Sequence, residues 1–78
     1  MAQTMKIKDY IEQRLEDDER LESRPVMHND WPVQAFELAS DTFVGIVYKN
    51  GRHVSVSDIE TVVVDDRKST APSIRIEI

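Results

Sequence analysis

The sequence contains no cysteine and only two glycines, Gly45 and Gly51. Without cysteine the chain can form neither a disulfide nor a thiolate metal site, and catalysis by a thiol is excluded. Two separated glycines cannot build the glycine-rich loop with which many proteins cradle phosphates. The longest apolar run, residues 43–48, is far too short to cross a membrane. Because residues 1–9 also lack the apolar core of a signal peptide, we expect a cytoplasmic protein.

Positive charge is also scarce. Lys and Arg number 10 against 15 Asp and Glu, which gives a net charge of −5. A nucleic-acid-binding protein needs clustered cations to displace counterions from phosphates, so this charge argues against a nucleic acid as partner. With 78 residues the chain is expected to form one domain, because a second would leave neither half able to bury a core.

The first third of the chain has the apolar spacing of a helix. Four apolar residues share one stripe of such a helix: Ile7, Ile11, Leu15 and Leu21. Pro25 disfavours helical geometry at the residue before it and so ends the element. We therefore predict one helix over residues 6–22, followed by a loop over residues 23–32 that is rich in turn-forming residues.

The remainder of the chain, residues 33–78, is rich in β-branched and aromatic residues. We expect strands over residues 33–38, 42–49, 52–56, 61–64 and 73–78, with turns or polar loops between them. The predicted fold is α+β. In it the N-terminal helix packs on a four- to five-stranded, mainly antiparallel, strongly bent sheet.

The Asn50-Gly51 pair between two of these runs predicts a β-hairpin, because both residues tolerate positive φ. A two-residue turn sets Tyr48 opposite His53. One face of the hairpin is then the core face, with Phe43, Val47, Val54 and Val56. The other face is half apolar, with Val44, Ile46, Tyr48, His53 and Ser55. This second face is either also buried or a surface where a partner docks.

Residues 43–64, FVGIVYKNGRHVSVSDIETVVV, resemble the closing half of a small SH3-like or Sm-like β-barrel. In such barrels a hairpin leads through one short helical turn into a last strand, and an N-terminal helix precedes the barrel in the Sm-like RNA chaperones. The resemblance implies a barrel-like topology for the sheet. It implies no functional residue: the segment before Thr42 is too short for the opening strands of an Sm protein, and the RNA-binding motif of that family has no counterpart.

No pattern typical of metal binding or catalysis is present. The histidines are His28 and His53, and together with Asp30 they do not reach the three or four spaced ligands of a zinc site. The adjacent carboxylates Asp65 and Asp66 lie in a polar run where nothing would shift their pKa values. No serine lies in the glycine pattern of a nucleophile elbow. We therefore expect no metal, no cofactor and no enzymatic activity.

One candidate binding surface surrounds the Asn50-Gly51 hairpin. Tyr48, Arg52 and His53 lie there, and Trp31 comes from the preceding loop; Trp, Tyr and Arg are the residues most enriched at binding hot spots. The alternative for Trp31 is a core position that closes the end of the sheet. The alternative for Tyr48 and His53 is an ordinary cross-strand pair.

A second candidate surface is the densest run of charge in the chain, which includes Asp17, Asp18 and Glu19. Such a run is commonly a solvated helix face. The alternative is an acidic ridge that fills a basic groove on another protein, whose charge would then steer association.

From these features we predict a small acidic protein-binding module that occupies a surface of a partner protein as an inhibitor or regulator. In size and charge it resembles small acidic phage proteins that block host enzymes. One alternative is an SH3-like or Sm-like nucleic-acid-binding protein with a local basic patch of Lys49, Arg52, His53, Arg67 and Lys68. The other is a structural subunit of a homo-oligomer or larger assembly, joined through the strand at Ser73–Ile78.

Overall fold

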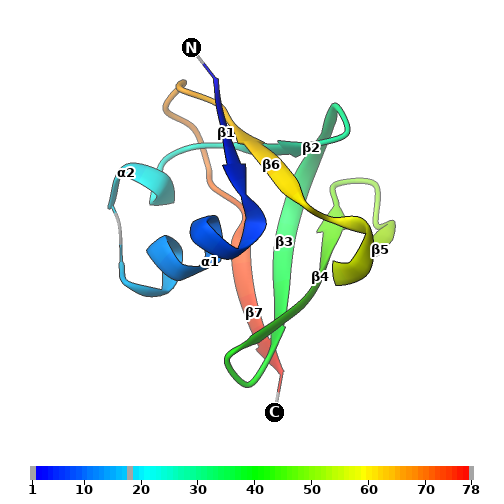
Figure 1. The fold of residues 1–78 in the computed structure, drawn as a ribbon. Coiled ribbons are helices and arrows are strands. Elements are labelled where there is room, and N and C mark those ends of the chain that lie inside the picture. The colour runs from blue at the N-terminus through cyan, green and yellow to red at the C-terminus, as the bar shows by residue number, and fades with distance from the viewer. Residues whose placement is uncertain (1, 18, 78) are drawn as a thin grey trace.

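The computed structural model describes residues 2–17 and 19–77. Figure 1 shows the α-helices together on one side of a sheet that bends around the core. In chain order the elements are β1 (Gln3–Lys6), α1 (Ile7–Leu15), α2 (Glu19–Glu22), β2 (Val26–His28), β3 (Trp31–Ala39), β4 (Thr42–Tyr48), β5 (His53–Ser55), the 3-10 turn η1 (Val56–Asp58), β6 (Thr61–Val64) and β7 (Ser73–Glu77).

The described strands form one 7-stranded sheet in the order β1-β6-β2-β3-β4-β5, with β7 attached to β3. All neighbours are antiparallel except β7, which runs parallel to β3. The predicted α+β class with a mainly antiparallel sheet is therefore confirmed, although the sheet has more strands than the four or five expected. The barrel is not confirmed, because β1 and β5 stand at opposite ends of the strand order and are not paired with each other in the described residues.

The single helix predicted over residues 6–22 is wrong. Lys6 belongs to β1, and α1 ends at Leu15, before Asp17 takes up a left-handed conformation with φ 65°. The N–H of Glu16 still bonds to the carbonyl of Glu12 at 3.0 Å, whereas that of Asp17 turns back to the carbonyl of Arg14 at 3.1 Å. This pattern is typical of a helix C-terminus, and Asp is one of the few residues that tolerate positive φ there. The predicted apolar stripe is interrupted as well, because Leu15 is exposed.

The predicted loop over residues 23–32 is also wrong in its second half, where β2 pairs with the start of β3. His28 lies opposite Trp31, and the connection consists of Asn29 and Asp30 alone. Their φ angles of 49° and 65° are those of a type I′ turn, which requires positive φ at both central residues. Asn29 and Asp30, which were predicted to belong to a loop, thus form the turn of a tight hairpin.

The β4–β5 hairpin is confirmed, but its predicted register is wrong by one residue. Val47 pairs with His53 and Ile46 with Val54. The N–H of Tyr48 bonds to the carbonyl of Arg52 at 2.8 Å, so the loop holds one residue more than a two-residue turn. In this loop only Gly51 has positive φ, at 87°. Such a loop is typically a type I turn followed by a left-handed glycine.

The shift exchanges the two faces of β4 over residues 46–48, because side chains alternate along a strand. Phe43 and Val54 stay on the core side, as predicted. Ile46 and Tyr48, predicted on the second face, lie in the core, and Val54 packs against it. Val56, predicted for the core, is 41% exposed. Val47 is buried on the opposite face of β4, where its partner in β3 is Ala35.

The core lies between the helices and the inner face of the bent sheet. Its largest fully buried side chains are Tyr10, Phe36, Leu21, Leu38, Ile46, Val26 and Val62. The ring centroids of Tyr10 and Phe36 lie 4.9 Å apart, and this contact fixes α1 on β3.

The predicted strand at the C-terminal end is confirmed as β7. Its apolar side is only partly buried, because Ile74 packs on the core and Ile76 is 57% exposed. Ile78 lies outside the described residues. No helix in the described ranges is long and apolar enough to span a membrane.

Candidate functional site

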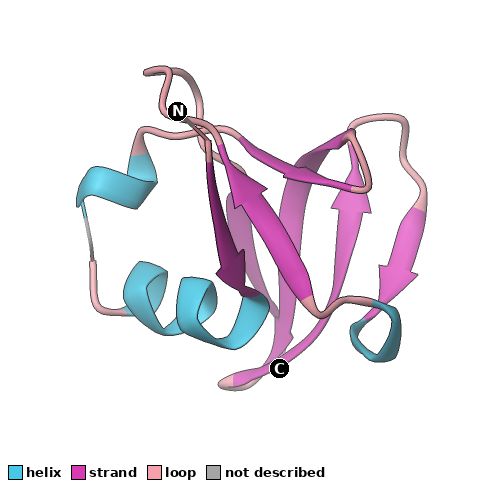
Figure 2. Ribbon diagram, turned by 45° about the horizontal axis from the view of Figure 1, so that its top comes forward, coloured by secondary structure: helices cyan, strands magenta, loops and turns pink. Residues whose placement is uncertain are grey.

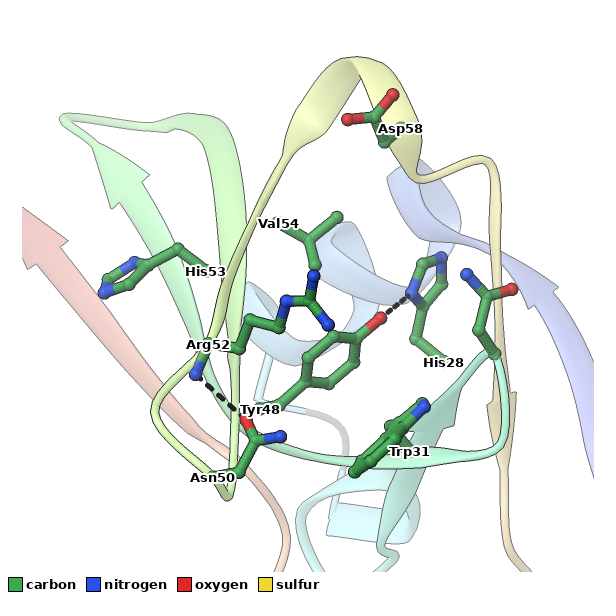
Figure 3. A pocket seen from close by; sticks show the side chains of 9 residues that line it. His28, Trp31, Tyr48, Asn50, Arg52, His53, Val54 and Asp58 are labelled. Atoms are coloured by element: carbon green, nitrogen blue, oxygen red, sulfur yellow. Dashed lines mark hydrogen bonds between the residues drawn. The ribbon is translucent and has the colours of Figure 1, made fainter.

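A pocket of about 320 Å³ lies between the tips of two hairpins, β2–β3 and β4–β5 (Figure 3). Its lining residues are His28, Asn29, Trp31, Tyr48, Asn50, Arg52, His53, Val54 and Asp58. Trp31, Tyr48, Arg52 and His53 were predicted from the sequence as a contact surface. The structure places all of them at this pocket, although their side chains do not all point into it.

The floor of the pocket is formed by Tyr48 and His28, which are both buried. The Tyr48 hydroxyl and Nδ1 of His28 share a hydrogen bond of 2.6 Å, and the two rings are stacked with centroids 6.0 Å apart. Burial lowers the pKa of His28 from its usual 6.5, so the imidazole is neutral at neutral pH. A neutral imidazole can accept a hydrogen bond from the hydroxyl or, in its other tautomer, donate one to the hydroxyl oxygen. The hydrogen bond satisfies the Tyr48 hydroxyl inside the protein and fixes the ring in place.

Trp31 forms the exposed wall of the pocket. Its ring centroid lies 6.2 Å from that of Tyr48, and the residue is 52% exposed. The alternative of a core position for Trp31 is therefore wrong. The reason is local: the Asn29-Asp30 turn sets Trp31 at the first position of β3, where the strand stands clear of the core. A half-exposed indole beside a second aromatic ring is costly for a free protein and favourable once a partner covers it.

The side chains of Arg52 and His53 point in different directions, although the two residues are neighbours in the chain. Figure 3 shows the guanidinium of Arg52 extending over the pocket toward the hydroxyl end of Tyr48, whereas the ring of His53 points away. Nδ1 of His53 lies 3.0 Å from Oε1 of Glu37 on the outer face of the sheet. The predicted cross-strand pair of Tyr48 and His53 is thus wrong, because the register shift sends the two side chains to opposite faces.

The predicted acidic surface lies elsewhere. Asp17 and Glu19 are exposed at the junction of α1 and α2, and Asp18 lies outside the described residues. A hydrogen bond with Asp17, together with the charge of that carboxylate, raises the pKa of Glu22. Figure 2 and Figure 1 both show the helices on the side of the molecule opposite β5 and η1. The structure therefore does not join the two predicted contact surfaces into one.

The residues of the basic patch that was predicted for a nucleic-acid-binding protein do not lie together either. Arg67 donates from its backbone N–H and its Nε to the carboxylate of Asp65, each at 3.0 Å, and these contacts hold the pKa of Asp65 below its usual value. Its loop lies beside α2, where the N–H of Ser69 bonds to the carbonyl of Ser23 at 3.0 Å. Arg67 and Lys68 are thus separated from the β4–β5 turn, which carries Arg52 (Figure 1).

A second hollow, of about 710 Å³, lies between α1 and the β3–β4 turn. Its apolar lining comes from Ile7, Ile11, Leu15, Phe43 and Val56. It contains none of the residues predicted for binding, and it has no aromatic residue as exposed as Trp31. Within the described ranges no group of three or more His, Cys, Asp or Glu residues is placed to hold a metal ion.

Sequence reasoning missed His28 and Asn29 as parts of the site. Asn29-Asp30 was the available signal, since Asn and Asp are the residues other than glycine that tolerate the left-handed conformation of a type I′ turn. Had this pair been interpreted as a hairpin turn, His28 would have been set opposite Trp31, as it is in the structure.

Comparison with protein-family models, with curated proteins and with solved structures finds no match to this chain. The interpretation of the site therefore depends on its geometry and chemistry.

Proposed function

We propose that this chain is a cytoplasmic protein-binding module, not an enzyme, and that it acts as an inhibitor or regulator by occupying a surface of a partner protein. One observation carries the proposal: Trp31 is 52% exposed on the wall of a pocket that also presents Tyr48 and Arg52. These three residue types contribute most of the binding energy in many protein interfaces.

The pocket is built to keep its shape without a ligand. The type I′ turn holds Trp31, the His28 hydrogen bond holds Tyr48, and the side chain of Asn50 accepts a 3.0 Å bond from the N–H of Arg52. Side chains that are already ordered lose little entropy on binding. A buried Tyr48 ring that is held by His28, between two hairpin turns of defined geometry, supports binding to another protein.

The same contacts argue against catalysis. The Tyr48 hydroxyl and Nδ1 of His28 are hydrogen-bonded to each other, and both residues are buried, so these two polar atoms are engaged inside the protein and not directed at a substrate. Asp58 is the carboxylate that lines the pocket in the described part of the chain, and no Ser, Thr or Lys of the described residues lines the pocket with it.

The experiment is capture of a partner from cell lysate with the wild-type chain, a Trp31→Ala variant and a Leu15→Ala control. Leu15 is also a large exposed apolar residue, 44% exposed, and it lies on α1 away from the pocket. We expect the wild type and Leu15→Ala to retain the same protein. Trp31→Ala should bind it about 30-fold more weakly, the effect of a hot spot worth about 2 kcal/mol. Equal retention by all three chains would contradict the proposal.

A charge-reversed Asp17→Lys/Glu19→Lys variant separates the two predicted surfaces. Its retention of the partner assigns the contact to the pocket. Loss of the partner with this variant alone, most visible at low salt, would instead support an acidic ridge in a basic groove.

One observation favours a second candidate, assembly through β7. This strand pairs with β3 on one edge and with no other strand of the described residues, and Ile76 is 57% exposed. An unpaired edge with an exposed apolar residue is a site where another strand can add. Sedimentation of the wild type at high concentration tests this candidate: a dimer that is lost in Ile76→Lys would support it, and a monomer would exclude it.

A further inference from the structure

The guanidinium of Arg52 makes no hydrogen bond or ion pair with any part of the chain that the structure describes. Two of the polar groups nearby are engaged: Tyr48 with His28 at 2.6 Å, and Asn50 with the N–H of Arg52 at 3.0 Å. The guanidinium lies over the pocket (Figure 3), on the same side of the sheet as the exposed wall of Trp31. A cation in this position can bind a ligand without giving up a contact inside the protein.

A free guanidinium recognises a particular chemistry. Its planar fork of N–H donors matches a carboxylate, to which it can donate two parallel hydrogen bonds. Trp31, on the other side of Tyr48, offers a flat apolar surface of the kind that packs against an aromatic or aliphatic side chain. A ligand that uses both features must carry a carboxylate next to an apolar group.

We propose that the pocket accepts a short segment of the partner protein in which an Asp or Glu stands next to an aromatic or aliphatic residue. The carboxylate binds Arg52, and the apolar side chain packs on Trp31. This inference rests on the proposed function, because it names the chemistry of the partner at the same pocket.

The charge of the chain restricts the ligand to a short segment. With a net charge of −5 the protein repels a broad acidic surface, whereas a single carboxylate interacts mainly with Arg52, because salt screens more distant charges beyond about 8 Å. The same charge argues against a single-stranded nucleic acid, which would need several cations along its backbone. Among the described residues that line the pocket, Arg52 is the only Lys or Arg. Asp58 also lines the pocket and carries the opposite charge.

The test is a selection from a random peptide library displayed on phage, performed in parallel on four chains: wild type, Arg52→Glu, Trp31→Ala and Lys68→Glu. Lys68→Glu changes the charge as much as Arg52→Glu does, but its position does not line the pocket. Trp31, Arg52 and Lys68 are all exposed, so these variants are expected to fold, which circular dichroism checks.

We expect wild type and Lys68→Glu to enrich peptides with an Asp or Glu next to an aromatic or aliphatic residue. Arg52→Glu should lose the acidic enrichment and bind a synthetic copy of the enriched peptide about 10- to 100-fold more weakly, as expected for loss of a charged hydrogen bond. Asp58→Asn should bind the same peptide about 2- to 5-fold more tightly, because it removes a repulsive charge at the surface.

Three outcomes would overturn the inference, and they are distinguishable. If the enriched peptides require Trp31 but carry no acidic residue, the proposed binding module stands. The proposal that Arg52 binds a carboxylate is then refuted. No enrichment that depends on Trp31 would refute the inference together with the proposed function. Binding of a (dT)₁₀ oligonucleotide that requires Trp31 and Arg52, without acidic peptides, would assign the pocket to single-stranded nucleic acid instead.

Discussion

Gly45 and Gly51 are the only glycines of the chain, and the structure needs them for different physical reasons. A Cβ on Gly45 would lie 2.5 Å from the carbonyl oxygen of Val54, a backbone atom of the neighbouring strand that can yield only if the strands separate. A Cβ on Gly51 would meet nothing within 4 Å, but its φ of 87° is strained for any other residue type. The two positions therefore separate a steric requirement from a conformational one.

We expect Gly45→Ala to lower the free energy of unfolding by about 1–3 kcal/mol, the usual cost of forcing atoms into a packed region. Gly51→Ala should cost about 1 kcal/mol. Gly51→Asn should be milder, because Asn tolerates positive φ, whereas Gly45→Asn should be at least as harmful as Gly45→Ala. Urea unfolding of the four variants measures these differences, and a neutral Gly45→Ala would contradict the close approach of β4 and β5.

His28 makes the stability of the fold depend on pH. Burial lowers its pKa in the folded protein below the 6.5 of the unfolded chain, so below pH 6.5 the unfolded chain takes up a proton that the folded protein does not. The contribution of neutral His28 to the free energy of unfolding is fully present above pH 6.5. It is lost as the pH falls toward the pKa of His28 in the folded protein. Wild type should therefore lose stability as the pH falls below 6.5, and His28→Asn should lose less over the same interval. The free energy of unfolding of both proteins is measured against pH. An equal loss in both would count against a neutral, buried His28.

Residue types at the site could be predicted from the sequence, but their exposure could not. Trp31, Tyr48 and Arg52 are the types expected at a contact surface, and all three line the pocket. Their exposures differ widely, because Trp31 is 52% exposed and Tyr48 6%. That difference is set by the turn before Trp31 and by the register of β4, neither of which depends on residue type alone. Tyr48→Phe, not Tyr48→Ala, is therefore the suitable probe of this position.

At the scale of secondary-structure elements, turn geometry decides which side chains reach the pocket. The β2–β3 turn uses positive φ at Asn29 and Asp30, at 49° and 65°. Left-handed conformations cost a residue with a Cβ roughly 1 kcal/mol, and glycine avoids this cost. The hairpin that presents Trp31 is thus formed against a local conformational penalty.

Replacement of Asp30 by glycine should relieve that penalty. We expect Asp30→Gly to raise the free energy of unfolding by up to about 1 kcal/mol, less the entropy that glycine adds to the unfolded chain. Asp41→Gly in the β3–β4 turn is the matched control, because Asp41 is not among the residues with positive φ. The control should lose about 0.5–1 kcal/mol if the added flexibility dominates. Thermal unfolding compares the two variants, and destabilisation by both would show that Asp30 stabilises the turn in another way.

The β4–β5 hairpin shows why sequence patterns predicted the element but not its register. Asn50-Gly51 fits both a two-residue turn and the longer loop that is observed, since either one uses Gly51 in a left-handed conformation. The choice is made by packing: the observed register puts Ile46 and Tyr48 into the core, two larger side chains than Val47. The break of the N-terminal helix at Asp17 was likewise hidden, because the apolar spacing continues past it to Leu21 in a separate helix.

At the scale of the whole molecule, strands far apart in sequence support the pocket. β6 pairs with β1 through Met5 and Val62, and it also pairs with β2 through Met27 and Val63. β2 ends at His28, which forms the floor of the pocket. Residues near the start of the chain are therefore linked to the pocket through a strand that begins at Thr61. No local pattern could have predicted β1, because its only apolar contact residue in the core cluster is Met5.

This arrangement predicts that the pocket and the rest of the sheet unfold together. Trp31 is the only tryptophan, so its fluorescence reports on the pocket, while circular dichroism reports on the whole chain. In a two-state domain the two thermal transitions coincide. Met5→Ala removes a buried side chain at the far strand and should lower both midpoints together, by about 10 °C or more for a loss of at least 2 kcal/mol. Lys6→Ala, an exposed neighbour on β1, should leave both nearly unchanged. A fluorescence transition that stays in place while circular dichroism shifts would show that the two hairpins around the pocket are stable without β1.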